Sequence, residues 1–341
     1  MKTKTFFISA IILIAVNVAA YAANTDYHLL KKIPLGGTGG WDYAAVDNAA
    51  RRLYVSRGTH VMVLDLTNDK VIGDIAPAPG VHGIAFALEF NRGFISNGRD
   101  NSVTIFDLKT LKILDKVNVG LNPDAIIYDP ASKRVFTFNG RSKDATALDA
   151  ASGKVAATIA LGGKPEFAAS DNNGKVYVNI EDTGEVVEID SVKLAVARRF
   201  LLAPGVEPTG MAFDLKNKLI FSGCHNKLMV VLDALSGKVV VTVPIGEGVD
   251  ACAFDPQTGL IFTSNGDGTL TVIKEASPNK FTVMQNVATQ HGSRTMALDL
   301  KSHRVYLPAA IFSKTEEEAM PNGRKHPAMV KDSFSIIVVG L

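Results

Sequence analysis

Cysteine is scarce in this chain, and its scarcity limits the covalent chemistry open to the protein. Cys224 and Cys252 are the only two cysteines among the 341 residues, so at most one intrachain disulfide can form. No CxxC pair is present, which argues against a thiol redox motif and a cysteine-based zinc site. We expect two buried free thiols that act as small apolar groups, with a bridge between them as the alternative.

Short catalytic motifs are also missing. The sequence has no GxSxG elbow, no HExxH pair, no Walker loop and no GxGxxG turn. These absences argue against a nucleophile elbow, a helix-borne zinc site and a local nucleotide-binding loop. An enzyme built from this chain would have to assemble its site from residues that lie far apart in the sequence.

The longest apolar run lies near the N-terminus. Lys2 and Lys4 precede an apolar segment from Phe6 to Val16, and Ala20-Tyr21-Ala22 supplies the small residues at which signal peptidase cleaves. The run is too short to span a bilayer. It predicts a cleaved secretory signal over residues 1–22 and a periplasmic or otherwise exported protein, with an uncleaved anchor as the alternative.

Charge of one sign is not in excess once this leader is removed. The full chain has 36 basic and 34 acidic residues, and loss of Lys2 and Lys4 leaves 34 basic residues against the 34 acidic ones. Non-specific nucleic-acid binding needs a basic excess to release counterions. The balance of residues 23–341 therefore argues against a nucleic-acid partner.

Residues 23–341 contain a repeat, which recurs seven times at intervals of roughly 40 to 46 residues. Each unit has a short apolar strand, an Asp, a turn and a second strand led by Tyr or Phe. Five units keep one spacing: Asp47 to Tyr54, Asp129 to Phe136, Asp214 to Phe221, Asp255 to Phe262 and Asp299 to Tyr306. The second unit has Ala87 at the Asp position, and the fourth is one residue shorter, from Asp171 to Tyr177. The repeat predicts an all-β fold, a seven-bladed β-propeller of four-stranded antiparallel blades.

The seventh unit lacks a fourth strand. The segment Tyr27 to Leu35 has the character of that strand, and we expect it to pair with Ser335 to Val339 and close the ring. Third strands end on residues such as Asp65 and Asp149, which we expect to accept hydrogen bonds within their own turns. No linker divides residues 23–341, so we assign a single domain.

Three motifs carry a resemblance to a known family. They are Leu53-Tyr54-Val55-Ser56, Val176-Tyr177-Val178-Asn179 and Phe262-Thr263-Ser264-Asn265. The chain resembles the YVTN-repeat, YncE-like family of exported propellers. The resemblance implies a seven-bladed propeller in the cell envelope and does not imply one chemistry. A nucleic-acid-binding role is associated with a member of the family, and the balanced charge argues against it here.

Polar residues recur at one register, five positions before the aligned Asp, where each innermost strand begins at the mouth of the central channel. They are Asp42, His82, Asp124, Glu166, Thr209, Asp250 and Arg294. Six of the seven are ionisable, although the neighbouring positions are mostly Ala, Ile, Met and Phe. The register therefore predicts a charged ligand site at the mouth.

Loops between the second and third strands reach the same face. They contribute Arg57, Arg99, Arg141, Glu181, His225 and Asp267, and Trp41 adjoins the register as a stacking platform or a packing residue. The arginines present planar forks that match a carboxylate or a phosphate. The alternative is that these residues are solvated turn tips whose charges neutralise one another.

Carboxylates that converge on a narrow channel repel one another unless a cation neutralises them. The four that suit a hard divalent cation are Asp42, Asp124, Glu166 and Asp250. His82 can join a transition-metal site, and zinc held by His82, His225 and His291 is a weaker alternative because no motif spacing supports it. Arg294 and water relieve the same repulsion without a metal.

One insertion, Ser313 to Asp332, breaks the repeat near this face. Its mixed charge fits a lid or a binding element, or else a solvated loop.

We expect a monomeric exported propeller that binds a small polar ligand or a cell-envelope protein at the charged mouth. A metal-dependent hydrolase or lactonase-like enzyme is the first alternative, with His82 and Asp42, or His291 and Asp250, as its candidate catalytic residues. A nucleic-acid-binding propeller is the second alternative. It would have to bind through Arg57, Arg99 and Arg141.

Overall fold

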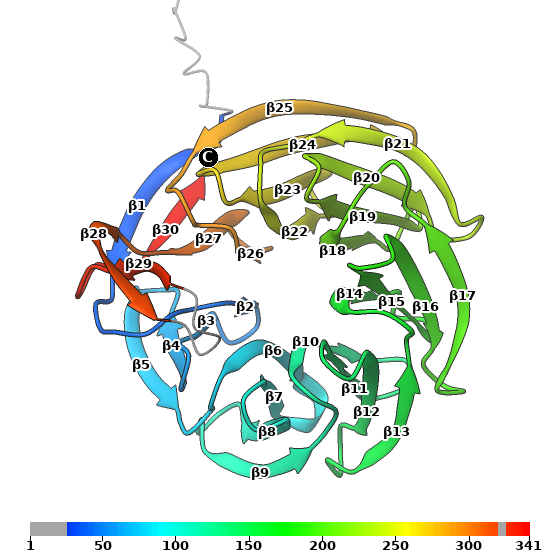
Figure 1. Ribbon diagram of the computed structural model, residues 1–341, viewed down its shortest axis with the longest axis horizontal. Helices are drawn as coiled ribbons and strands as arrows, with labels where there is room; N and C mark the ends of the chain where they lie inside the picture. Colours follow the sequence, from blue (N-terminus) through cyan, green and yellow to red (C-terminus); the bar gives the residue numbers. More distant parts are fainter. Residues whose placement is uncertain (1–25, 320–324) are drawn as a thin grey trace, which may run out of the picture.

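Seven four-stranded antiparallel sheets surround a central axis in the computed structural model, which describes residues 26–319 and 325–341. The chain runs around the ring from β1 to β30 (Figure 1). The predicted seven-bladed β-propeller is therefore confirmed. The predicted signal, residues 1–22, lies outside the described residues. Within the described ranges, no helix has the length and apolar character that a membrane crossing requires.

The first three blades each use four consecutive strands. Blade one comprises β2 (Ala44–Asp47), β3 (Arg52–Ser56), β4 (Val61–Asp65) and β5 (Lys70–Ile75). Blade two comprises β6 (Val81–Ala87), β7 (Arg92–Asn97), β8 (Ser102–Asp107) and β9 (Ile113–Asn118), with the 3-10 helix η1 (Leu88–Phe90) after β6. Blade three comprises β10 (Pro123–Asp129), β11 (Arg134–Asn139), β12 (Asp144–Asp149) and β13 (Val155–Ala160).

The next three blades follow the same plan. Blade four comprises β14 (Pro165–Ser170), β15 (Lys175–Ile180), β16 (Glu185–Asp190) and β17 (Ala195–Leu201). Blade five comprises β18 (Pro208–Asp214), β19 (Leu219–Cys224), β20 (Leu228–Asp233) and β21 (Lys238–Pro244). Blade six comprises β22 (Val249–Asp255), β23 (Leu260–Asn265), β24 (Thr269–Ser277) and β25 (Lys280–Ala288).

Blade seven joins the two ends of the described chain. Its strands are β26 (Ala297–Asp299), β27 (Arg304–Ala309), β30 (Ser335–Gly340) and β1 (His28–Pro34). β1 pairs antiparallel with β30, so the predicted closure by the N-terminal strand is confirmed. The insertion expected to be a loop instead contains a hairpin, β28 (Phe312–Ala319) and β29 (Lys325–Met329), because its two arms pair with each other.

The aromatic residue that leads each second strand is buried between blades. These residues, each at most 2% exposed, are Tyr54, Phe94, Phe136, Tyr177, Phe221, Phe262 and Tyr306. Several of them pack against the innermost strand of the following blade, as Tyr177 does against Phe213 with ring centroids 5.3 Å apart. Burying an aromatic side chain contributes about 2 to 3 kcal/mol. The aromatic residue of the repeated motif thus recurs because it packs between neighbouring blades.

Two further expectations from the sequence are met inside the blades. Asp65 and Asp149 accept backbone hydrogen bonds from Thr67 and Ser152, each at 2.7 Å. Hydroxyl and backbone donors of these turns hold the pKa of both carboxyls below its usual range. Cys224 and Cys252 are free and buried, so they act as small core residues.

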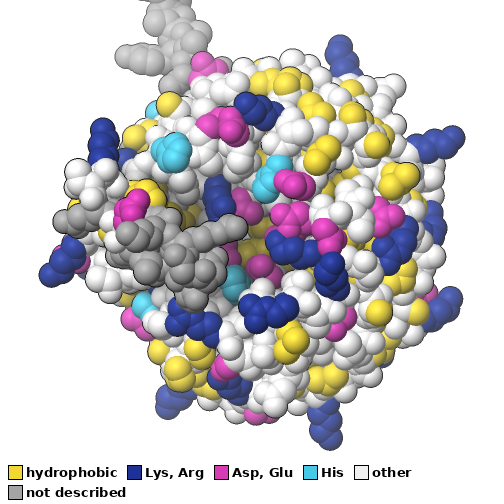
Figure 2. All heavy atoms as spheres, in the orientation of Figure 1, with side chains coloured by type: hydrophobic (Ala, Val, Ile, Leu, Met, Phe, Trp, Pro, Cys, Tyr) yellow, Lys and Arg dark blue, Asp and Glu magenta, His cyan; other side chains and the backbone are white. Residues whose placement is uncertain are grey.

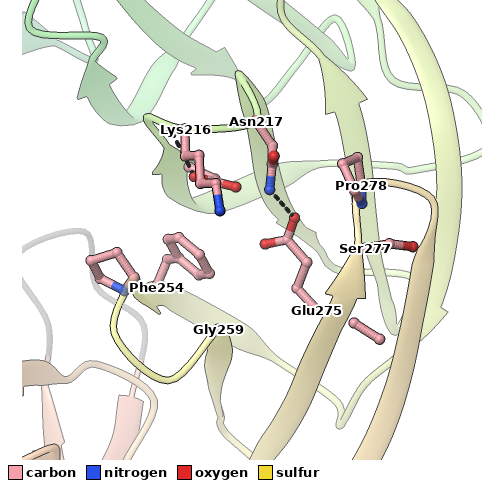
Figure 3. A pocket seen from close by; sticks show the side chains of 10 residues that line it. Lys216, Asn217, Phe254, Gly259, Glu275, Ser277 and Pro278 are labelled. Carbon is pink, nitrogen blue, oxygen red and sulfur yellow. Dashed lines mark hydrogen bonds between the residues drawn. The ribbon is translucent and has the colours of Figure 1, made fainter.

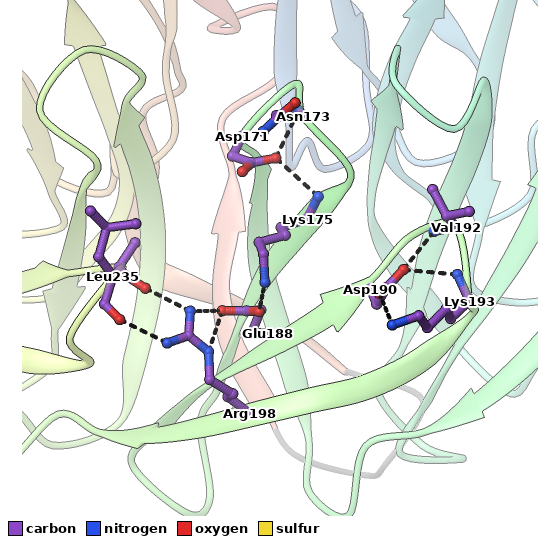
Figure 4. A network of polar contacts seen from close by, with 10 residues as sticks. Asp171, Asn173, Lys175, Glu188, Asp190, Val192, Lys193, Arg198 and Leu235 are labelled. Carbon is purple, nitrogen blue, oxygen red and sulfur yellow. Dashed lines mark hydrogen bonds and ion pairs between the residues drawn. The ribbon is translucent and has the colours of Figure 1, made fainter.

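Blade four also buries a charge. Glu188 on β16 has no exposed side-chain surface, and it pairs with Lys175 and Arg198 (Figure 4). Arg198 continues to the next blade, where it donates to the carbonyl oxygens of Leu235 at 2.8 Å and Ala234 at 2.9 Å. The carboxylate is therefore paired on both sides and links blade four to blade five.

Candidate functional site

All seven residues of the polar register line one cavity of about 280 Å³, which we call the mouth. Its lining residues are Asp42, Tyr43, His82, Asp124, Lys164, Glu166, Glu181, Thr209, His225, Asp250 and Arg294. Figure 2 shows acidic and basic side chains around the central hollow. The ring therefore brings together side chains from every blade.

Bulges at the start of the innermost strands explain why these residues leave the sheet. In five blades the strand register shifts across the polar position. The residues inside these shifts are His82, Asp124, Glu166, Thr209 and Asp250. A bulge removes a residue from the ladder and redirects its side chain. The sequence pattern located the positions, but the bulge that turns them toward the axis was not predicted.

Hydroxyl groups from neighbouring strands hold the bulged backbone in place. Thr295 Oγ1 donates to the Asp42 carbonyl at 2.6 Å, and Ser96 Oγ donates to the Asp124 carbonyl. Ser56 Oγ accepts the Asp42 N–H at 2.9 Å. The Ser that recurs near the end of the second strand, as at Ser56 and Ser96, was a signal in the sequence for this role.

Three donor atoms from adjacent blades meet on one side of the mouth. His82 Nδ1 lies 2.6 Å from Asp42 Oδ2 and 3.7 Å from Asp124 Oδ1. Burial opposes the charged imidazolium, but the hydrogen bond with Asp42 and the negative charge of Asp124 outweigh it and raise the pKa of His82 to about 9. The imidazolium therefore bridges two carboxylates at neutral pH. The three residues also offer donor atoms within 4.8 Å of one another, a spacing suited to one metal ion.

Lys164 pairs with two further carboxylates of the mouth, those of Glu166 and Glu181. Its Nζ lies 2.7 Å from Glu166 Oε1 and pairs with Glu181 as well. Burial and the charge of Asp124 raise the pKa of Glu166 well above its ordinary value despite this pairing. Lys164 was missed by sequence reasoning because it lies two positions outside the polar register. Tyr43 was missed too, since it looks like a strand aromatic; it stacks on Phe167 with ring centroids 4.6 Å apart.

Asp250 has a permanent cation on one side. Arg294 Nε lies 3.0 Å from Asp250 Oδ2. Burial nevertheless raises the pKa of Asp250 to about 6, against the effect of Arg294. Burial raises the pKa of Asp124 in the same way. Among the described residues, the mouth thus holds more carboxyl groups than its cations neutralise.

Several other predicted residues lie away from the mouth. Arg57 is 2% exposed, with its guanidinium carbon 3.5 Å from the centroid of the Phe334 ring, and burial lowers its pKa to about 10. Outside the mouth lining are also Arg99, Arg141, Asp267 and His291. The proposed pair of His291 with Asp250 and the three-histidine zinc set therefore do not share this cavity.

A second cavity of about 730 Å³, which we call the lateral cavity, adjoins the mouth at Arg294. Its lining residues are Thr38, Gly39, Gly40, Trp41, Gly292, Arg294, Phe312, Met329 and Lys331. Trp41 packs on Phe312 and Phe334, with ring centroids 5.9 and 5.3 Å apart. It therefore both packs the blade and presents an aromatic wall.

Comparisons with solved structures place the chain among seven-bladed β-propellers. It is similar to a chain of Kuenenia stuttgartiensis hydrazine synthase, with a TM-score of 0.70, 14% identity, and coverage of 85% of this chain and 95% of that one. It is also similar to a chain in the crystal structure of a mitotic checkpoint complex, with a TM-score of 0.73, 14% identity, and coverage of 97% and 100%. No family model and no curated protein matches the sequence. At this identity the likeness concerns the fold alone.

Proposed function

We propose that this protein is a ligand-binding propeller whose mouth takes a small polar ligand with a positively charged group. The charge balance of the mouth carries the proposal. Its five carboxyl groups belong to Asp42, Asp124, Glu166, Glu181 and Asp250. Among the described lining residues, they face two permanent cations, Lys164 and Arg294, and the titratable His82 and His225. A cationic ligand compensates buried carboxylates without the protons they otherwise retain.

The lateral cavity suits the rest of such a ligand. Ligand pockets are mostly apolar, with a few polar groups that set orientation. Trp41, Phe312 and Met329 form an apolar wall next to the charged mouth. We therefore assign the charged end of the ligand to the mouth and an apolar end to this wall.

Replacing Asp124 by Asn and Glu166 by Gln tests the proposal. The double variant keeps the shape of both side chains and removes their capacity to ionise, so we expect binding of cationic ligands to weaken at least about tenfold. Thermal shift with a panel of small amines, amino acids and carboxylic acids measures the change. Asp115→Asn with Glu89→Gln makes the same charge change at exposed positions outside the mouth and should respond like wild type. Equal stabilisation of the double variant and wild type by the amines would contradict the proposal.

A divalent metal ion is a second candidate, favoured by the clustering of Asp42, His82 and Asp124 donor atoms. A metal has to displace the proton that His82 carries, so its affinity should rise with pH toward about 9. Bound metal could then polarise a carbonyl, as a hydrolase requires. Titration with Zn²⁺ and Mn²⁺ at two pH values separates this candidate from an amine, whose binding does not need His82 deprotonated.

We also propose that the chain is an exported member of the YVTN-repeat, YncE-like family. The leader pattern up to Ala22 and the repeated motif, such as Leu53-Tyr54-Val55-Ser56, support this assignment. N-terminal sequencing of the protein from its own cell should begin at Ala23. An intact leader in the cytoplasmic fraction would overturn the assignment.

A further inference from the structure

At the ends of the innermost strands opposite the mouth, three blades share one arrangement. In blades three, six and seven, the Asp that ends the strand receives a hydrogen bond from a donor of the following blade. Asp129 Oδ2 accepts from Ser191 Oγ at 2.7 Å, and Asp255 Oδ2 lies 2.6 Å from His303 Nδ1. Arg51 Nη1 and Nη2 donate to the two Asp299 carboxylate oxygens, each at 2.6 Å. A buried carboxylate is thereby satisfied across the blade boundary.

Asp214 in blade five has no such donor among the described residues. Its Oδ1 accepts the Lys216 N–H at 2.8 Å. Its Oδ2 is buried without a hydrogen-bond partner among the described residues, and the whole residue is 2% exposed. A buried carboxylate oxygen without a donor is costly. The neighbouring Glu275 carboxyl can pair with Asp214 only while one of the two groups holds a proton.

The position that should donate to Asp214 holds another carboxylate. In blade four, Ser191 follows Asp190, which pairs with the first residue of β15. In blade six, Glu275 follows Lys274, which pairs with the first residue of β23. Glu275 therefore occupies in blade six the place that Ser191 occupies in blade four. An ionised carboxylate accepts hydrogen bonds and donates none.

A cavity of about 350 Å³ lies at this boundary, lined among others by Asp214, Lys216, Asn217 and Glu275. Figure 3 shows Asn217 bonded to Glu275, with Lys216 extending into the same space. Asn217 Nδ2 donates to Glu275 Oε1 at 2.8 Å, which directs its Oδ1 elsewhere. Glu275 is 9% exposed, and burial together with the charge of Asp214 raises its pKa. Like charges in such a place need a counter-ion or a proton.

We propose that this cavity binds a hard divalent cation of the calcium class between blades five and six. Its protein ligands are Asp214 Oδ2 and the Glu275 carboxylate, with water completing the shell. Both are the oxygen donors that calcium takes. The site lies at the other end of the innermost strands from the mouth, so it is independent of the proposed ligand.

Calcium titration of the whole protein tests the site, with melting temperature and isothermal calorimetry as readouts. At saturating CaCl₂ and pH 7.5, wild type should melt about 5 °C higher than in EDTA, because the ion binds only the folded state. Glu275→Ser restores the donor that blade four uses. This variant should fold without calcium and should lose the response. The Asp124→Asn, Glu166→Gln variant keeps this cavity intact and should retain the response.

Two results would overturn the site. One is a calcium response in the Glu275→Ser variant equal to that of wild type, which would show that calcium binds elsewhere. The other is no calcium response in wild type, because the two carboxyls would then share a proton instead. Loss of the calcium response in each of the two single variants, Asp214→Asn and Glu275→Ser, supports the assignment.

Discussion

His82 shows how one side chain of the mouth depends on three blades. It comes from β6, and its two carboxylate neighbours come from the start of blade one and from β10. Its pKa is raised to about 9 from 6.5. A group with a raised pKa adds stability that is fully present below its unfolded value and is lost as the pH rises through its folded value. The window for His82 is therefore between about 6.5 and 9.

We predict that the unfolding free energy falls across this window and that His82→Gln removes much of the fall. The shift corresponds to about 3 kcal/mol at most. Because the side chain is 27% exposed, we expect about 1 to 2 kcal/mol after solvent screening. Urea denaturation at pH 6.5 and pH 9.5 measures both proteins. The raised pKa of Glu166 also makes stability fall as the pH rises. Only the difference between wild type and His82→Gln therefore reports the contribution of His82.

Individual site residues were predictable where the repeat constrained them. The register located Asp42, His82 and Arg294 because every blade starts its innermost strand at the same position. Arg57 was expected to face a ligand, but its direction depends on stacking against Phe334, which lies 277 positions further along the chain. Neither local sequence nor periodicity carries information about that contact.

At the scale of elements, β16 is held between its neighbours by charge as well as by apolar packing. Glu188 has 0% side-chain exposure, whereas its partners Lys175 and Arg198 are 42% and 38% exposed. A buried ion pair is expensive to break because the remaining charges lose their compensation. Arg198 also reaches the Leu235 carbonyl, so the cost extends to the boundary with blade five.

We predict that Glu188→Ala destabilises the protein by about 3 kcal/mol, which is the low end for a broken buried pair because both partners are partly solvated. Lys193→Ala in the same blade is the control. It removes an exposed pair with Asp190 and should cost less than about 0.5 kcal/mol. Chemical denaturation compares the two variants. Equal losses would show that Glu188 contributes no more than a surface charge.

Most of the strands could be predicted from the sequence. The Tyr- or Phe-led motif predicted the second strands, and the third strands β4 and β12 end at Asp65 and Asp149, as predicted. The hairpin of β28 and β29 was not predicted, because its arms pair only with each other and follow no repeat. A segment outside the repeat has no second copy against which its pattern can be checked.

For the whole molecule, closure of blade seven decides whether a ring exists. Deleting residues 26–34 removes β1 and the buried residues Tyr27 and Ile33. We expect the melting temperature to fall by about 10 °C, from the loss of roughly 4 to 5 kcal/mol of apolar burial. A synthetic peptide of residues 26–36 added in excess should restore it by pairing with β30. A scrambled peptide should not, and restoration by both would contradict the pairing.

The ring was predictable as a whole because seven imperfect copies average out local irregularities. Function was not, since each copy contributes only one or two side chains to the mouth. The charge balance that supports a cationic ligand depends on distances such as the 2.7 Å between Lys164 and Glu166. Spacing in the sequence does not give such distances.

The pairing of β1 with β30 also determines the order in which the blades can form during synthesis. His28 lies opposite Gly340, so the strand made early on the ribosome has no partner until more than 300 residues have followed it. Six blades can form their own sheets during that interval, while the seventh waits with an open edge. The ring therefore closes only when the strand that is synthesised first pairs with the strand that is synthesised last, and the edge of β30 stays unpaired until then.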